Sequence, residues 1–358
     1  MFSNIAVYAG ARARRIIQDR GLREDDISGI IGASGGPKFL VLAGLDKYIF
    51  SSWFKKRTKP LEILGSSIGA WRGAAFACED PVAKHELFVN AYLTQHYEKK
   101  TTAADVTAES IRIMDIYLHD TDIDYILGRS KICLNIISTR CTGLSASDNN
   151  ALLMAALAPA VIANIASRKA LLKFFTRTMF YDRRSQSPFR SIAGQDSQIP
   201  LTPDNIRGAI LSSGSIPFVM EGISGIPGAP EGTYRDGGLT DYHPVPVKEH
   251  RGIILYPHFT ERIIPGWLDK SLVWRKPAKE SLADILLIAP SKKFIESLPY
   301  RKIPDRSDFA KFEGNDNERL RYWNEVIQKS SIMGEEFMEA AAGNRIRNIM
   351  KDAESLGS

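Results

Sequence analysis

Residues 61–78 read LEILGSSIGAWRGAAFAC, an apolar run followed by a glycine-flanked turn and a run of small residues. The apolar run over 61–64 predicts a buried strand, and residues 70–78 predict a helix that can pack closely on it. Gly65 and Gly69 flank the turn because a strained strand-to-helix connection has little room for side chains there. The segment therefore predicts a strand, a tight turn and a helix in direct succession.

The same order of elements occurs one unit earlier in the chain. Ile27 to Ile31 form a short apolar run, residues 32–37 are rich in glycine, and residues 39–50 have the pattern of a helix with one buried side. Two successive units of this kind are typical of a parallel sheet covered by helices, with functional loops at the carboxyl ends of the strands. We therefore expect an α/β fold.

Other elements follow from the same apolar patterning. Strands are predicted at 132–138, 253–257 and 284–289, helical stretches at 151–180 and 317–342, and loops at 184–204 and 222–233, while residues 1–21 form an amphipathic segment. We expect one catalytic domain because the motifs described below need distant segments brought together. Its expected bounds are 1–315, with a core of about 27–260, a helical insertion at about 144–185, and a C-terminal helical region over 316–358 packed on the domain.

The composition is that of an ordinary globular protein, with 44% hydrophobic and 25% charged residues among 358. Cys78, Cys133 and Cys141 are too few for a disulfide framework and match no zinc pattern. Residues 1–21 lack the apolar core of a secretory signal, and no run reaches the roughly 18 apolar residues of a membrane span. We therefore expect a cytoplasmic protein. Its net charge of +6 suits anionic partners without naming one.

Ser67 is the centre of a Gly-x-Ser-x-Gly pattern that runs from Gly65 to Gly69. The turn is expected to expose the Ser67 hydroxyl at the amino end of a helix, where the helix dipole favours a developing anion. Between a strand and a helix, this pattern predicts a nucleophilic serine.

A glycine-rich turn upstream supplies a second requirement of acyl transfer. Backbone amides near Gly35 and Gly36, beside Ser34 and Lys38, can stabilise the oxyanion, because glycine lets the chain approach the substrate closely. The turn is not a P-loop, since Pro37 precedes the lysine and a phenylalanine follows it, and it lacks the dinucleotide spacing. A plain tight turn remains an alternative interpretation.

The third motif is Asp236-Gly237-Gly238. A carboxylate on a glycine turn can approach a serine hydroxyl directly and accept its proton. A hairpin turn is the alternative interpretation of the same three residues.

Together these blocks resemble the signature motifs of the patatin-like phospholipases, in the order of that family. The resemblance covers about residues 27–247 and rests on residues 34–38, 65–69, 211–217, 236–239 and 244–247. It implies a three-layer α/β/α fold with a central, mostly parallel sheet and a helical insertion. It also implies a phospholipase A-like lipid acyl hydrolase with a Ser67–Asp236 dyad, an oxyanion hole at Gly35 and Gly36, an acyl-enzyme intermediate, and neither cofactor nor metal.

Two residues depart from the glycine block of the family. Ser34 stands where the first of three glycines is usual, and Phe39 where a last glycine is usual, whereas Lys38 keeps the basic position. Two alternatives therefore stay open beside the lipid hydrolase. One is a general carboxylesterase or thioesterase on small acyl substrates, and the other is a catalytically silent lipid-binding member.

A Ser-His-Asp triad is a further alternative, with His243 or His258 following Asp236 in the chain. His243 comes only seven positions after Asp236, so that arrangement would be cramped. The alternating carboxylates of Asp120, Asp122 and Asp124 lack the glycine and closing glutamate of a calcium loop, and we expect no metal site there.

The substrate and partner expectations rest on residues 151–180. Apolar residues alternate there with Arg168, Lys169, Lys173 and Arg177, and Trp267 and Trp274 lie in a second aromatic and basic segment. Such a composition suits peripheral contact with an anionic membrane, and a core helix with a solvated basic face is the alternative. We expect a lipid or acyl-ester substrate and no nucleic acid. Nothing in the sequence indicates an oligomeric state.

Overall fold

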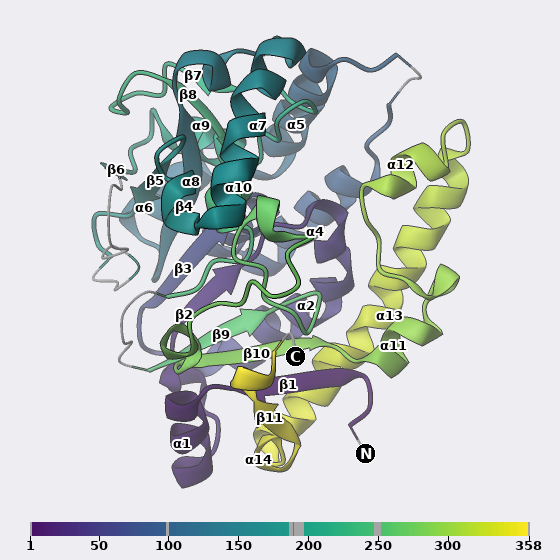
Figure 1. Ribbon diagram of the computed structural model, residues 1–358. Helices are drawn as coiled ribbons and strands as arrows, with labels where there is room; N and C mark the ends of the chain where they lie inside the picture. Colours follow the sequence, from purple (N-terminus) through teal and green to yellow (C-terminus); the bar gives the residue numbers. More distant parts are fainter. Residues whose placement is uncertain (1, 98–99, 186–188, 190–196, 247–251, 357–358) are drawn as a thin grey trace.

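One mixed β-sheet runs through the protein in a computed structural model that describes residues 2–97, 100–185, 189, 197–246 and 252–356 (Figure 1). Within these residues the sheet has 11 strands, which are β1 Ile5–Ala9, β2 Ile27–Gly32, β3 Leu61–Ser66, β4 Ile132–Cys141, β5 Thr176–Tyr181, β6 Ser197–Pro200, β7 Ile223–Ser224, β8 Thr233–Asp236, β9 Ile253–Pro257, β10 Ile285–Pro290 and β11 Met350–Asp352.

The strands follow the order β11-β1-β10-β9-β2-β3-β4-β5-β6, and β8 pairs with both β4 and β7. From β10 to β4 in this order, all neighbouring strands run parallel. Strands β1 and β5 pair antiparallel with β10 and β4. The central strands are almost wholly buried, as parallel strands covered on both faces must be. The expected mostly parallel central sheet is confirmed.

Helices flank the sheet and complete the expected α/β/α architecture (Figure 1). They are α1 Ala11–Arg20, α2 Ala43–Ser51, α3 Ile68–Ala77, α4 Pro81–Leu93, α5 Ala103–Tyr117, α6 Asp120–Gly128, α7 Asn150–Ala166, α8 Arg168–Leu171, α9 Ile206–Ser213, α10 Gly238–Asp241, α11 Lys292–Ser297, α12 Ser307–Lys311, α13 Asp316–Ala342 and α14 Ile346–Ile349. Every residue of α3 is buried, which explains why that helix is built of glycine, alanine and few large residues.

Four sequence predictions of secondary structure were wrong in part. Residues 176–180 were expected to be helical but belong to strand β5, because its Thr-Arg-Thr-Met-Phe-Tyr sequence is rich in β-branched and aromatic residues. Strands β6 and β7 lie in the two segments expected to be loops. Residues 36–42 form a 3₁₀-helix ahead of α2, where a continuous helix was expected over 39–50.

The two ends of the chain complete one edge of the sheet. Strand β1 lies between β10 and β11, so the first and last described strands are neighbours. Helix α13 packs along α2, and the amide of Gly44 donates to Ser330 Oγ over 2.8 Å at their contact. The expected division of the chain at residue 316 stays a prediction.

The core is one large apolar cluster around the sheet, with a second, smaller cluster beneath α7. Cys78, Cys133 and Cys141 are buried free thiols. Across the described ranges, no helix is both long enough and apolar enough to cross a lipid bilayer.

Candidate active site

Strand pairing brings the two predicted catalytic residues together. Strand β3 runs parallel to β4 as far as the pair Ser66–Ile137, and β8 runs antiparallel to the same strand as far as the pair Asp236–Ser138. Because β5 occupies the other edge of β4, strands β3 and β8 share one edge, and their carboxyl ends meet there. Ser67 follows the end of β3 directly, so it lies opposite Asp236.

Ser67 occupies the strained turn that its motif predicts. Its backbone angles are φ 55° and ψ −129°, a conformation that side-chain-bearing residues rarely adopt, and it is the N-cap of α3. Its Oγ donates a hydrogen bond of 2.7 Å to Asp236 Oδ2. Both residues are nearly buried, with 5% of Ser67 and 7% of Asp236 exposed. The hydroxyl thus points at a carboxylate oxygen, with no other side chain between them.

Close contact between two backbones explains why the turn ends in glycine. A Cβ on Gly69 would lie 2.1 Å from the carbonyl oxygen of Gly32, at the end of the neighbouring strand β2. Backbone at that position cannot give way without moving the sheet. The second glycine of the motif therefore lets helix α3 begin directly against β2, which fixes the direction of the Ser67 side chain.

Asp236 is held from both sides at the end of β8. Its Oδ1 accepts the amide of Gly238 over 2.6 Å, while Oδ2 accepts Ser67. A Cβ on Gly237 would lie only 2.2 Å from the Ile137 carbonyl oxygen, so the chain can turn there only with glycine. Helix α10 follows the turn, and the described partners of β8 are β4 and β7, which both precede it in the chain, so the hairpin interpretation is not favoured.

The environment of Asp236 opposes its negative charge. Burial raises the pKa of the Asp236 carboxyl above its usual value, and the hydrogen bonds from Ser67 and Gly238 partly offset this shift. The positive charges of Arg306 and Lys270 act in the same direction as those hydrogen bonds. A buried carboxylate with a raised pKa is a stronger proton acceptor than one in water.

Ser213 is a site residue to which the sequence analysis gave no role. It lies fully buried at the end of α9, in the gap between the ends of β3 and β8. Its Oγ accepts the amide of Ser67 over 2.8 Å and donates to the Ile137 carbonyl over 2.6 Å. Its own carbonyl accepts the amide of Gly237 over 3.1 Å. Ser213 therefore joins the backbones of the turns that carry Ser67 and Asp236 to β4.

The glycine turn at residues 34–36 lies beside Ser67 and Asp236. Ser34, Gly35, Gly36, Ser67 and Asp236 line one small hollow. Within the described ranges, the amides of Gly35 and Gly36 have no recorded protein acceptor, so both are available to a ligand. Gly36 has a φ of 55°, in the region that favours glycine. The predicted oxyanion turn thus adjoins the serine.

An apolar cavity of about 470 Å³ also adjoins Ser67. Its volume lies within the range of small-molecule binding sites. Ser67 and Gly36 belong to its lining, and the rest is mainly apolar, including Ile68, Trp71, Tyr92, Val106, Ile113, Ile216, Val219, Met220 and Phe309. The arrangement offers an apolar chain a place next to the serine hydroxyl.

Comparison with known families agrees with this geometry. The model of the patatin-like phospholipase family matches residues 33–247, which include both glycine turns, Ser67, Ser213 and Asp236. The chain belongs to the patatin-like phospholipase family. Membership supports an activity on lipid acyl esters in general. No curated protein matches the chain.

The two departures from the patatin-like glycine block have structural explanations. Ser34 donates its Oγ hydrogen to Ser66 Oγ over 3.0 Å, and its amide donates to the Tyr242 carbonyl over 2.8 Å, so it ties the turn to β3 and α10. Phe39 is buried and stacks on Phe88 with ring centroids 5.2 Å apart. Neither side chain forms a hydrogen bond with the backbone amide of Gly35 or Gly36 among the described residues. Both amides therefore remain available as hydrogen-bond donors.

Neither candidate histidine contacts the dyad in the part of the chain that the structure describes. His243 Nδ1 accepts the amide of Ile264 over 2.9 Å, and His258 Nδ1 donates to the Thr260 carbonyl over 2.6 Å. Burial lowers the pKa of His243 well below its usual value and that of His258 to about 3, so both rings are neutral. The rings pack on each other with centroids 4.3 Å apart. This geometry favours direct Ser67–Asp236 pairing over a triad.

The three aspartates of the incomplete calcium motif lie on helix α6, not in a loop. Asp122 pairs with Lys84 at 2.5 Å. Among the described residues, no group of three or more His, Cys, Asp and Glu side chains is placed to hold a metal.

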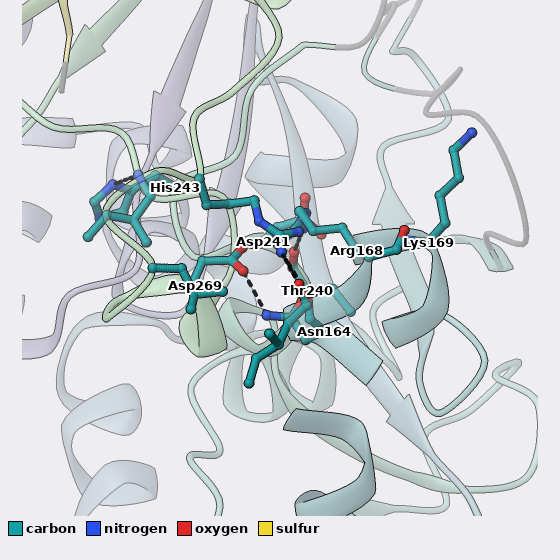
Figure 2. Close-up of polar contacts among 12 residues, drawn as sticks. Asn164, Arg168, Lys169, Thr240, Asp241, His243 and Asp269 are labelled. Carbon is teal, nitrogen blue, oxygen red and sulfur yellow. Dashed lines mark hydrogen bonds and ion pairs between the residues drawn. The ribbon is translucent and has the colours of Figure 1, made fainter. Parts of the chain in front are cut away.

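A polar network ties the helical insertion to the catalytic elements, as Figure 2 shows. Arg168 pairs with the fully buried Asp269 at 2.5 Å and donates to the Thr240 carbonyl in α10. Asn164 of α7 donates to the other oxygen of Asp269 over 2.7 Å. In the figure, Lys169 points away from this network. Asp269 therefore anchors residues 267–275 between the insertion and the turn that carries Asp236.

Proposed function

We propose that the protein is a phospholipase A-like lipid acyl hydrolase with Ser67 as nucleophile and Asp236 as base. The 2.7 Å hydrogen bond from Ser67 Oγ to Asp236 Oδ2 is the observation that carries this proposal. Ser67 Oγ attacks the ester carbonyl carbon while its proton passes to Asp236. The carbonyl oxygen becomes an oxyanion, which accepts hydrogen bonds from the amides of Gly35 and Gly36.

The remaining steps need only the same groups and water. Asp236 returns its proton to the leaving alcohol as the tetrahedral intermediate collapses, which leaves an acyl group on Ser67. A water molecule then attacks this ester and gives its proton to Asp236, and the free fatty acid leaves as Ser67 regains the proton. Residues Ser34, Gly65, Gly69, Gly237 and Gly238 support the three turns that carry the oxyanion amides, Ser67 and Asp236, and Lys38 lies beside the oxyanion turn.

The proposed preference for fatty acyl chains rests on the apolar cavity that Ser67 adjoins. A cavity lined by aliphatic and aromatic side chains favours an apolar chain by about 0.8 kcal/mol for each buried methylene. A short acyl group leaves much of that surface unfilled.

We expect the protein to release fatty acids from long-chain esters, and the Ser67→Ala variant to release at least about 10³-fold less. The measurement is a panel of phospholipids, acylglycerols, short soluble esters and acyl thioesters, with released acid quantified by mass spectrometry. Ser51→Ala is the matched control, because Ser51 is exposed at the end of α2. Cleavage of only short esters or thioesters indicates a carboxylesterase or thioesterase, and lipid binding with no release indicates a silent member.

We also propose peripheral contact with anionic membranes through an exposed apolar surface on α7 and on the loop formed by residues 267–275. One side of α7 is buried against the smaller core cluster, including Leu153 and Leu157. The other side is apolar as well as exposed, including Met154 (59%), Ile162 (70%) and Ile165 (53%). An exposed apolar side of α7 differs from the alternative interpretation, in which the exposed side of a core helix is basic and solvated.

The 267–275 loop adds to the same surface. Val273 and Trp274 are 66% and 64% exposed, and Arg275 donates to the carbonyls of Asn164 and Ile165, which keeps them beside the end of α7. Lys169, Lys173 and Lys276 are exposed in the same segments and supply positive charge. Apolar side chains with a basic surround are typical of interfacial binding. The cytoplasmic location expected from the sequence stays a prediction.

Ile162→Glu is expected to lower binding to anionic vesicles about tenfold at low salt, because a carboxylate is both polar and repelled by the lipid charge. Co-sedimentation with phosphatidylglycerol vesicles measures this. Ile332→Glu is the matched control, since Ile332 is 41% exposed on the distant helix α13. Absence of wild-type binding at low salt, or equal loss in both variants, argues against this surface.

A further inference from the structure

Three cations lie near one another beside the oxyanion turn and Asp236, and the Asp305 carboxylate acts electrostatically on one of them, Lys38. Lys38 follows the oxyanion turn, Lys270 follows Asp269, and Arg306 precedes α12. All three are partly buried, and none forms a salt bridge with a described residue. Each nevertheless acts electrostatically on its neighbours: Arg306 and Lys270 on Asp236, and Arg306 and Lys38 on Lys270.

Arg306 stands at the junction of the two spaces next to Ser67. It lines both the apolar cavity and the small hollow that contains the dyad and the oxyanion turn. Its side chain lies over Gly36, because a Cβ built on that glycine would be 3.7 Å from Arg306 Nε. A group held by Arg306 therefore lies beside the reacting carbonyl and not at the far end of the acyl chain.

Lys270 packs on two aromatic residues that line the hollow. Its Nζ lies 4.1 Å from the centroid of the Tyr242 ring and 5.5 Å from that of Trp267, and both of these residues line the hollow. The adjacent Asp269 is held by Arg168 and Asn164, as Figure 2 shows for these labelled side chains. Burial, followed by the charges of Arg306 and Lys38, lowers the pKa of Lys270 to about 7.

Three neighbouring cations in a partly buried site repel one another and lose hydration. Among the described groups that affect the pKa of Lys270, only the Asp236 carboxylate is negatively charged. Asp236 already accepts hydrogen bonds from Ser67 and Gly238. A bound dianion would supply the missing charge. Phosphate suits the set, since a guanidinium binds two of its oxygens and ammonium groups bind it as point charges.

We propose that Arg306 and Lys270 form a subsite for a phosphate joined to the scissile ester a few bonds from its carbonyl. The proposal rests on the proposed function and assigns the residues that select an acyl ester of a phosphorylated alcohol over one without phosphate. Coenzyme A thioesters also carry phosphate, but their phosphates lie a long linker away from the carbonyl. Lys270 and Arg306 lie outside residues 33–247, so this selectivity comes from the chain beyond the family match.

The test compares two monoacyl substrates with the same acyl chain in the same neutral detergent micelles. One is lysophosphatidic acid, and the other is the corresponding monoacylglycerol, which lacks the phosphate. Arg306→Gln is expected to lower kcat/KM for lysophosphatidic acid by about 10- to 100-fold, the usual effect of losing hydrogen bonds to a charged group. For monoacylglycerol the change is expected to stay below about threefold. Lys270→Gln is expected to change the same ratio in the same direction.

Arg301→Gln is the matched control, because Arg301 is an exposed arginine of the same segment and lines neither space. An unchanged substrate ratio in Arg306→Gln overturns the proposal. The proposal is also overturned if Arg306→Gln lowers kcat/KM more for an acyl-CoA with the same acyl chain than for lysophosphatidic acid. That result would mean that Arg306 binds the distant phosphates of coenzyme A.

A binding measurement separates failure of this proposal from failure of the proposed function. Octyl phosphate contains no carboxylic ester, so its binding does not depend on hydrolysis, and Trp267 in the lining of the hollow offers a fluorescence signal. The wild type is expected to bind octyl phosphate at least about tenfold more tightly than Arg306→Gln does. Equal binding overturns the subsite. Binding that depends on Arg306 in a protein that cleaves no ester supports the subsite and contradicts the hydrolase.

Discussion

Asp236→Asn is expected to lower kcat on a cleavable ester by about 10³- to 10⁴-fold, as the loss of a general base does in serine hydrolases. Asparagine has the shape of aspartate, and its side-chain oxygen can still accept a hydrogen bond from Ser67. It cannot accept the serine proton, because an amide is not a base in this pH range. The fold is expected to stay intact, since the change removes a charge whose burial is unfavourable. Fatty acid release measures the loss, and thermal unfolding checks the fold.

The pH dependence of activity tests the role of Asp236 independently. Burial raises the pKa of Asp236, so its carboxyl becomes protonated at a higher pH than an exposed aspartate does. Activity is therefore present above this raised pKa and lost as the pH falls through it, with an acid limb above the ordinary value of about 4. Near-normal turnover in Asp236→Asn, together with loss in His243→Ala, contradicts the dyad and favours a triad.

Gly69→Ala is expected to lower the free energy of unfolding by about 3 kcal/mol or more, a large share of the stability of a typical domain. The added methyl carbon would lie 2.1 Å from the Gly32 carbonyl oxygen, far inside contact distance, and both partners are backbone. Relief requires α3 to move away from β2, which also displaces Ser67. Urea unfolding measures the loss, and any folded fraction is expected to have reduced turnover.

The control for this substitution is Gly128→Ala. Gly128 is exposed at the end of α6, and a Cβ there meets nothing within 4 Å. Alanine at that position is expected to leave stability unchanged or raise it by up to about 1 kcal/mol, because it restricts the unfolded chain. Wild-type stability in Gly69→Ala would mean that α3 does not begin against the end of β2.

The local elements around the site were predictable because their signals are local. A glycine-flanked serine between an apolar run and small residues can form few structures, and residues 61–66 and 68–77 follow that pattern. The meeting of Ser67 and Asp236 was predictable only through the family resemblance, since 169 positions separate them. Their contact depends on β3 and β8 sharing one edge of β4, which no local pattern encodes.

No sequence pattern predicts the other residues of the site. Ser213 is one of several serines in its segment, and its role follows from the gap that it fills between two strand ends. Lys270 and Arg306 are ordinary basic residues in the sequence, and only the folded chain brings them to the hollow beside Ser67. Residues 176–180 were misread because apolar and basic residues continue from α7 into β5, and pairing with β4 decides their conformation.

Covalent labelling with a fluorophosphonate tests the central claim most directly, because this probe reacts only with an activated serine hydroxyl. After digestion and mass spectrometry, the label is expected on the peptide containing Ser67, and Ser67→Ala is expected to lose it. Asp236→Asn is expected to label far more slowly, since its serine lacks a base. Label on Ser66, Ser213 or another serine, or hydrolysis of lipid by a protein whose Ser67 stays unmodified, would contradict the account.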